Sequence, residues 1–180
     1  MLLNKIFLQT FLFLSAIFIF SCGGVSEFQN GPVIDPVVFL TGESQGHRVV
    51  RDRNYNVKFV ADVNRSCRPA SELAGECEDT VIYFNPPGTV KESFKFQITY
   101  DESLKLWLKI EGKKTSLAGR IYGSGLHLTG ELPVPGEIDK SIPVETRWDR
   151  ISSDEKLSLQ KDIYFFMGIH TGTVETIWEK

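Results

Sequence analysis

The chain has 180 residues, and its 20 lysines and arginines nearly balance its 23 aspartates and glutamates, for a formal net charge of −3. That length suits one domain of ordinary size and is short for a multidomain enzyme. The near-balanced charge argues against a nucleic-acid partner, and 24% charged with 12% aromatic residues excludes bulk disorder.

The first element is a short apolar segment. Lys5 is the only charged residue before residue 22, and an apolar run from Ile6 to Phe20 follows it. A charged start before a short apolar stretch is typical of a secretory signal, and the stretch is too short to span a bilayer comfortably. We therefore predict a signal peptide over residues 1–21.

The next residues, Ile19-Phe20-Ser21-Cys22, resemble the lipobox of a bacterial lipoprotein. A branched residue stands at −3, a small residue at −1, and the cysteine that receives lipid follows. Phe20 departs from the small residue usual at −2, as in the relaxed lipoboxes of spirochaetes. The resemblance covers residues 1 to about 24 and implies lipid on Cys22 that anchors the chain in a membrane. The alternatives are an uncleaved N-terminal anchor and a cleaved soluble export in which Cys22 is incidental.

The residues after Cys22 bear on location. Gly23 and Gly24 are not the aspartate that retains enterobacterial lipoproteins in the inner membrane, so the resemblance favours an outer-membrane anchor with a periplasmic or surface-exposed domain. The glycine-containing and polar composition predicts a lipidated tether over residues 22–35. Residues 36–180 then form a single domain.

Export also bears on Cys67 and Cys77. In an oxidising compartment these two cysteines are expected to form a disulfide, which would contribute about 3 kcal/mol through the unfolded state. Pro69 could begin one short helical turn inside the loop. Two sulfurs without a nearby histidine or second cysteine pair do not make a zinc site.

The remaining apolar segments alternate with a period of two, and no long window shows helical spacing. We predict strands over 36–41, 55–63, 80–85, 90–100, 103–111, 115–122, 125–132, 144–151, 156–160, 163–170 and 172–178. This pattern predicts an all-β fold, either an antiparallel β-sandwich or a lipocalin-like up-and-down barrel.

The register can be predicted between residues 90 and 132, because residues that face each other across strands share one side of the sheet. The apolar faces match when turns lie at 101–103, 112–113 and 123–124, all with plausible turn residues. The result is a four-stranded meander in which Ile98 faces Leu106 and Ile121 faces Leu126.

The same register gathers cations on the outer face beside an exposed tryptophan. Lys105 faces Arg120, which faces His127, and like charges directly opposite are unfavourable. We predict an anion-binding patch for lipid headgroups, sulfated glycans or an acidic protein. Its members are Lys95, Lys105, Trp107, Lys109, Arg120 and His127. The alternative is an ordinary solvated face, or one covered by another strand.

One catalytic pattern occurs. Ser44 lies in Gly42-Glu43-Ser44-Gln45-Gly46, which matches the G-x-S-x-G nucleophile elbow, and His47 follows. The elbow requires a strand-to-helix turn above a parallel sheet, whereas the residues after His47 have an extended pattern. We interpret the segment as a turn between strands, and keep a serine hydrolase using Ser44 as a remote alternative. The histidines have no metal-ligand spacing, so we predict no catalytic, metal or cofactor site.

These observations predict a lipid-anchored, exported β-domain that is a binding or structural module at the outer membrane or cell surface, and not an enzyme. The leading alternative is a lipocalin-like carrier of a small apolar ligand, which requires a cavity of at least about 300 Å³ instead of a filled core.

Overall fold

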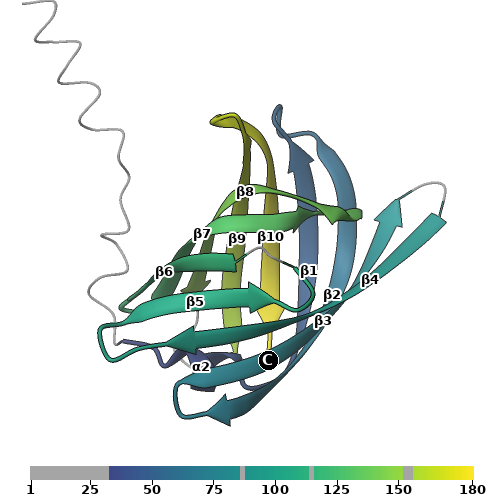
Figure 1. Cartoon of the computed structure of the whole chain (residues 1–180). Coiled ribbons are helices and arrows are strands. Elements are labelled where there is room, and N and C mark those ends of the chain that lie inside the picture. The colour runs from purple at the N-terminus through teal and green to yellow at the C-terminus, as the bar shows by residue number, and fades with distance from the viewer. Residues whose placement is uncertain (1–32, 86–87, 114–115, 152–155) are drawn as a thin grey trace, which may run out of the picture.

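The computed structural model describes residues 33–85, 88–113, 116–151 and 156–180. Ten antiparallel strands follow one short helix and close into a barrel in which β1 pairs with both β2 and β10 (Figure 1). The elements are α2 (Pro36–Leu40), β1 (Gly42–Asp52), β2 (Val57–Ser71), β3 (Ala74–Asn85), β4 (Gly88–Tyr100), β5 (Lys105–Ile110), β6 (Ser116–Tyr122), β7 (Gly125–Val134), β8 (Glu137–Arg150), β9 (Leu157–Phe166) and β10 (Ile169–Glu179). The up-and-down barrel is therefore confirmed, and the sandwich is not formed.

Alternating burial along the strands explains the closure. In β5, for example, every second residue is buried, so that Leu106, Leu108 and Ile110 face the interior while the residues between them face solvent. Inward side chains from all ten strands meet in one core. Each strand pairs with two neighbours, which closes the barrel. The first half of β4 extends past β5, however, and pairs with β3 alone.

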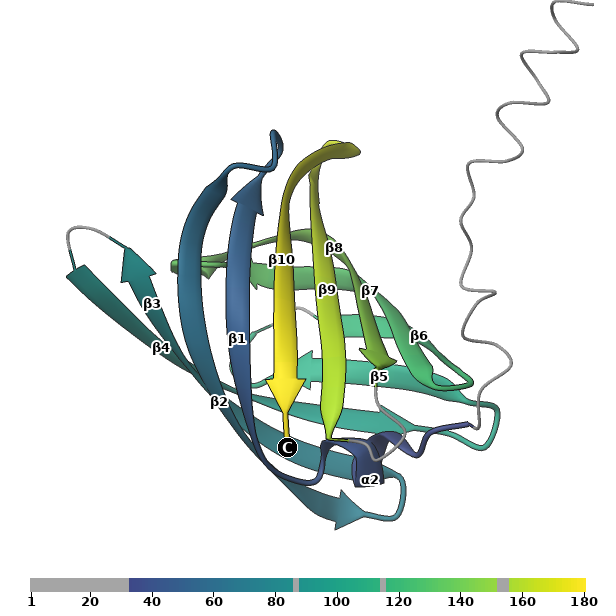
Figure 2. The same cartoon turned by 180° about the vertical axis from the view of Figure 1, so that it is seen from behind.

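The helix α2 lies across one end of the barrel, beside the C-terminus (Figure 2). Residues 36–41 were predicted as a strand, and that prediction is wrong. Asp35 caps the helix by accepting the N–H groups of Val37 (2.8 Å) and Val38 (3.1 Å), and Pro36 follows at the first helical position. Phe39 is buried in the core, and Ile34 before the helix is also buried, so the packed domain begins within the predicted tether. Among the described residues, no helix has the length and apolarity needed to span a membrane.

The predicted meander is formed by β4 to β7. Its last two strand pairs have the predicted register: Leu108 faces Leu117, and Ile121 faces Leu126 around the turn at 123–124. The register centres the connection between β5 and β6 on Gly112 and Lys113, as predicted, and within it the N–H of Lys113 donates to the carbonyl of Ile110.

The first pair of the meander was predicted wrongly by two residues. Ile98 faces Leu108 instead of Leu106. The turn lies one residue later because Leu104 adopts a left-handed conformation with φ of 61°. Asp101 holds this turn by accepting the N–H groups of Ser103 (2.9 Å) and Lys105 (3.0 Å).

Three other boundaries differ from the prediction. Residues 42–46 belong to β1 and form no turn. The segment after Pro69 continues β2 into a tight hairpin with β3, with no helical turn. The predicted strands at 156–160, 163–170 and 172–178 are two strands, because the chain turns at Met167-Gly168, both with positive φ. Polar residues at inward positions obscured these strands in the sequence.

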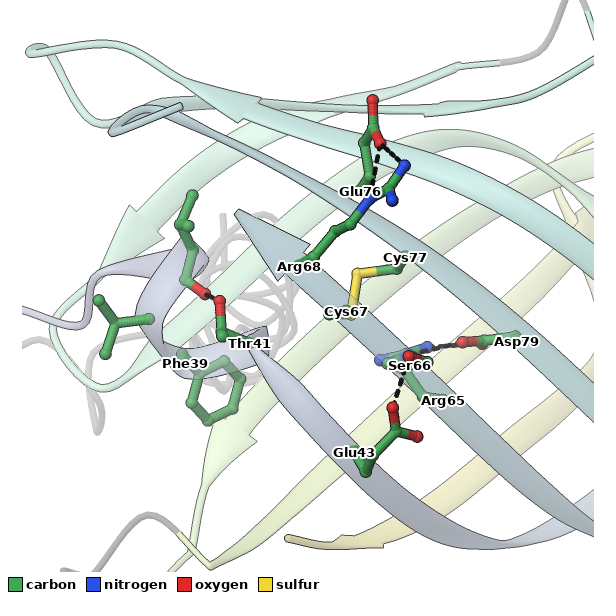
Figure 3. Close-up of a disulfide and its surroundings, with 12 residues drawn as sticks. Phe39, Thr41, Glu43, Arg65, Ser66, Cys67, Arg68, Glu76, Cys77 and Asp79 are labelled. Carbon is green, nitrogen blue, oxygen red and sulfur yellow. Dashed lines mark hydrogen bonds and ion pairs between the residues drawn. A yellow bond between two sulfur atoms is a disulfide. The ribbon is translucent and has the colours of Figure 1, made fainter. Parts of the chain in front are cut away.

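The disulfide between Cys67 and Cys77 is confirmed. The two cysteines face each other across β2 and β3 with a Cα–Cα distance of 4.1 Å. Figure 3 shows the cross-strand pairs on either side, Arg68 with Glu76 and Arg65 with Asp79. The disulfide therefore fastens the hairpin from which the interior Arg65 projects.

Candidate ligand site in the barrel

The predicted cationic patch is only partly assembled. Lys105, Arg120 and His127 face one another across β5, β6 and β7, and Arg147 of β8 extends the row. The tryptophan of the next row, Trp107, is 41% exposed. The two-residue shift between β4 and β5 places Gln97 instead of Lys95 opposite Lys109, while Lys109 still faces Ser116 as predicted. Both lysines line a groove together with Glu76, Glu78 and Glu111.

Carboxylates neutralise part of this row. Glu145 accepts hydrogen bonds from Arg147 Nε (3.0 Å) and Nη2 (2.7 Å). It also lies 3.2 Å from His127 Nε2, although the geometry there does not make a hydrogen bond. Lys95 Nζ is 3.8 Å from Glu78. The exposed Lys105 and Arg120 make no ion pair with a described residue, so the anion-binding prediction now depends on these two and Trp107.

Ser44 does not form a nucleophile elbow. It lies within the extended strand β1 at an inward position, opposite Arg65 of β2. His47 lies on the outer face of the same strand, where its Nδ1 is 2.9 Å from Asp62. The serine and histidine are thus on opposite faces of one strand, and the hydrolase alternative lacks the pairing that it requires.

The interior of the barrel contains a buried ion pair. Arg65 Nε and Nη2 each donate to one oxygen of Asp79 at 2.7 Å, and the side chains are 4% and 1% exposed. The guanidinium also lies over three aromatic rings, 3.9 Å from the centroid of Trp178, 4.9 Å from Trp148 and 5.1 Å from Phe96. This pair fills the half of the barrel nearer α2.

A second group of polar side chains occupies the centre. Arg48, which is 7% exposed, donates from Nε to Thr176 Oγ1 at 3.1 Å. Gln160 donates from Nε2 to both oxygens of Asp162 at 3.1 Å and accepts from Trp178 Nε1 at 3.1 Å. Asp162 is nevertheless not an ion-pair partner of Arg48, so the two buried charges share only long-range attraction.

Two buried polar atoms beside this group have no partner among the described residues. They are Thr146 Oγ1 and Trp148 Nε1, on residues that are 1% and 3% exposed. The Thr146 hydroxyl lies close enough to Asp162 to favour the charged carboxylate, but not in hydrogen-bonding geometry. Orphaned polar atoms are uncommon in a core and require an explanation.

Burial shifts the titration of this cluster. It raises the pKa of Asp162 in spite of the opposing charge of Arg48. It also raises the pKa of Tyr83 to about 12, and places the pKa of Tyr164 well above its ordinary value. Burial lowers the pKa of Arg48, but the combined attraction of Tyr83, Asp162, Asp79 and Tyr164 outweighs it, so the net pKa is raised. Arg48 therefore remains a buried cation.

The interior polar groups line a cavity of about 60 Å³. Its walls include Arg48, Thr146, Trp148, Asp162 and Tyr164. A cavity of this size has room for a few water-sized groups. It is much smaller than the 300 Å³ that the carrier alternative requires, so the closed interior alone cannot hold an apolar ligand.

The end of the barrel opposite α2 carries a larger groove of about 540 Å³. Its apolar wall includes Val50, Phe59, Ile142, Phe166 and Val174. Charged residues from β1, β2 and the β7–β8 hairpin stand among them: Arg51, Asp52, Lys58, Glu137 and Lys140. This volume lies in the range of small-molecule sites, which commonly occupy the mouths of β-barrels.

The groove and the inner cavity adjoin. Val134, Pro135 and Tyr164 line both. Tyr164 Oη donates to the carbonyl of Pro133 at 3.2 Å, which ties β9 to the β7–β8 hairpin at the boundary. The apolar groove therefore lies next to a small inner cavity, whose wall combines the polar side chains above with apolar residues such as Phe96, Leu108 and Leu117.

The barrel has counterparts among solved structures. No protein-family model matches the sequence, and no curated protein matches it. The solved structure of the S-type phycobiliprotein lyase from Guillardia theta is similar, with a TM-score of 0.52 and 9% identity over 79% of this chain and 87% of that chain. A redesigned β-barrel matches with a TM-score of 0.44 and 9% identity, over 83% of this chain and 98% of that chain. The likeness to the lyase shows a shared lipocalin-like barrel fold.

The sequence predictions missed the interior residues. Arg48, Arg65, Asp79 and Asp162 are buried charged residues at inward positions of their strands. Their positions in the period-two alternation could have revealed them: Arg65, for example, stands between the buried Val63 and Cys67 on the same face of β2. The predicted lipidation site, Cys22, lies outside the described residues. Within the described residues, no group of three His, Cys, Asp or Glu is placed to hold a metal ion.

Proposed function

We propose that this protein is an exported, lipid-anchored β-barrel that binds a small, largely apolar ligand in the groove at its open end. The observation that carries the proposal is the 540 Å³ groove with its apolar wall. Apolar surface that closes around a ligand supplies most of the binding free energy, and the surrounding polar groups orient the ligand. The likeness to the phycobiliprotein lyase supports only the barrel on which such a groove is built.

A neutral fluorescent probe tests the groove. N-phenyl-1-naphthylamine gains fluorescence in apolar surroundings, and we expect saturable binding to the purified chain. Ile142→Trp fills the groove and should weaken this binding about tenfold or more. Ile177→Trp places the same ring on β10 outside the groove, at a residue that is 49% exposed, and serves as the matched control. Equal affinity in both variants would place the probe elsewhere and contradict the proposal.

The anchor is tested separately. Cys22 is the proposed acceptor of lipid, so Cys22→Ser should move the protein from the membrane fraction to the soluble fraction and abolish incorporation of labelled palmitate. Unchanged membrane association without labelling would favour an uncleaved N-terminal anchor.

A second candidate function is binding of an anionic partner at Lys105, Arg120 and Trp107. The specific observation in its favour is that Lys105 and Arg120 face each other in register without a described carboxylate partner. Replacing all three residues by alanine should remove salt-sensitive binding to heparin or anionic vesicles. Binding that survives the triple replacement rules this candidate out.

A further inference from the structure

The inner cavity presents hydrogen-bond donors that lack acceptors. Trp148 Nε1 can only donate, the Thr146 hydroxyl can donate, and both are buried without a partner in the described chain. Arg48 faces the same cavity and makes no ion pair with a described carboxylate, although it is 7% exposed. Leaving buried donors and a buried cation unmatched costs stability, so a matching acceptor is expected there.

We infer that the inner cavity is a carboxylate subsite, in which Arg48 supplies the opposite charge and Thr146 and Trp148 donate hydrogen bonds. The inference rests on the proposed function and names its ligand class, an amphipathic carboxylic acid whose tail lies in the groove. A cavity of about 60 Å³ accepts a carboxyl group and excludes the tail. Because Val134, Pro135 and Tyr164 line both spaces, head and tail can be occupied by one molecule.

The carboxylates already in the cavity limit the choice of ligand. Asp79 is held by two hydrogen bonds from Arg65, so its charge is matched locally. Glu92 is half-buried on the cavity wall. Asp162 remains, and burial already raises its pKa. A second carboxyl group beside Asp162 allows the pair to share one proton, which a sulfate or a sulfonate does poorly.

Three probes separate the possibilities: dodecanoate below its micelle concentration, 1-dodecanol and acetate. Calorimetric titration of the purified chain should show dodecanoate binding about tenfold or more tightly than dodecanol. Arg48→Met should abolish that difference and leave the affinity for dodecanol unchanged. Arg68→Met removes an exposed arginine on the outer face of β2 and is the matched control, for which no change is expected.

An NMR measurement on the wild-type protein tests the subsite even if the Arg48 variant does not fold. The indole N–H signal of Trp148, assigned with Trp148→Phe, should shift in wild-type protein with dodecanoate and stay in place with dodecanol. Thr146→Val, which preserves the side-chain shape, should weaken dodecanoate binding severalfold.

The outcomes are distinct. Equal affinities for dodecanoate and dodecanol, with the Trp148 signal unmoved, overturn the carboxylate subsite and leave the proposed function standing. Failure of both long-chain probes to bind overturns the proposed function itself. A shift of the Trp148 signal by acetate at the same concentration as by dodecanoate keeps the carboxylate subsite, and identifies a free small carboxylate instead of an amphiphile.

Discussion

At the residue scale, the interior of this barrel combines a satisfied ion pair with an unsatisfied cation. Arg65 has a bidentate carboxylate and three aromatic rings, whereas Arg48 has the Thr176 hydroxyl as acceptor, the Tyr83 hydroxyl near it and no carboxylate within ion-pair distance among the described residues. A buried charge that has an opposite charge and hydrogen-bond partners contributes to a unique packed structure. A buried charge that lacks such a counter-charge points to a ligand that supplies it. The two arginines therefore have different roles despite similar burial.

The ion pair of Arg65 makes a prediction for stability. Asp79→Ala leaves the Arg65 charge buried and uncompensated, which should lower the free energy of unfolding by about 3–5 kcal/mol. Glu76→Ala is the control, because it breaks the exposed pair with Arg68 between the same two strands and should cost at most about 1 kcal/mol. Urea denaturation followed by tryptophan fluorescence measures both. Similar losses in the two variants would contradict the distinction.

Asp162 makes a prediction for pH dependence. Burial raises its pKa in the folded protein, so the folded state binds more protons than the unfolded state between the ordinary pKa of 3.8 and the raised value. Its contribution to the free energy of unfolding therefore falls as the pH rises through that window and is constant above it.

The variant Asp162→Asn should remove this fall. Its stability relative to wild type should increase between about pH 4 and the raised pKa, as measured by urea denaturation across pH. Glu102→Gln, at an exposed residue in the turn between β4 and β5, corrects for the loss of one negative charge. A difference between Asp162→Asn and wild type that is independent of pH would show that Asp162 is not protonated preferentially in the folded state.

At the scale of elements, the strands β6 and β7 approach unusually closely at inward glycines. A Cβ atom on Gly119 would overlap the carbonyl oxygen of His127 and lie 2.7 Å from Leu128 Cα, and Gly130 is crowded against Ser116 in the same way. These contacts are with backbone, which cannot move aside as a flexible side chain can.

Gly119→Ala should therefore disrupt the β6–β7 pairing and lower the stability by about 3 kcal/mol or more. Gly75→Ala is a suitable control in β3, because its added methyl group would make only ordinary contacts, the nearest at 3.4 Å with Ile98. Thermal unfolding and amide exchange of β6 report the effect. If the Gly119 variant is as stable as the Gly75 variant, β6 and β7 can move apart to accommodate the methyl group without a loss of stability.

Most of these elements could be predicted from period-two alternation, and the exceptions have physical causes. The Gly123–Ser124 turn and the pairing of Lys105 with Arg120 follow from matched apolar faces. The shift between β4 and β5 depends on the left-handed Leu104, for which the sequence gives no glycine or asparagine signal. The polar residues of β1 and β9 resemble loops in the sequence because they face a polar interior, so the candidate site itself was the least predictable part.

At the scale of the whole molecule, the proposed anchor and the ligand groove lie at opposite ends of the barrel. The described chain begins beside α2, where the N–H of Ile34 donates to the carbonyl of Gly123 at 2.9 Å. The groove lies at the other end, next to exposed apolar residues at the hairpin tips, including Phe166 (59% exposed) and Met167 (86% exposed). Such exposed apolar tips favour insertion into a membrane. The orientation of the barrel therefore depends on whether the proposed anchor allows the tips to reach that membrane.

Chain length decides between the two orientations. If Cys22 carries the lipid that we propose, the segment between it and Ile34 reaches at most about 40 Å even when fully extended. The 11 residues of β1 alone span about 35 Å. To place the tips in the anchoring membrane, this segment would have to run nearly fully extended along the barrel, with a large loss of conformational entropy. We therefore expect the α2 end to face the membrane and the groove to face away.

Fluorophores on introduced cysteines measure this orientation on lipid vesicles. A label at Val38→Cys, on an α2 residue that is 60% exposed, should be quenched by spin-labelled lipid, and a label at Met167→Cys should be quenched by iodide in solution. A ligand can then enter the groove from the aqueous phase, because the mouth is not blocked by the bilayer. The reverse pattern would show that the apolar tips insert in spite of the short tether, and that the ligand enters the groove from the membrane.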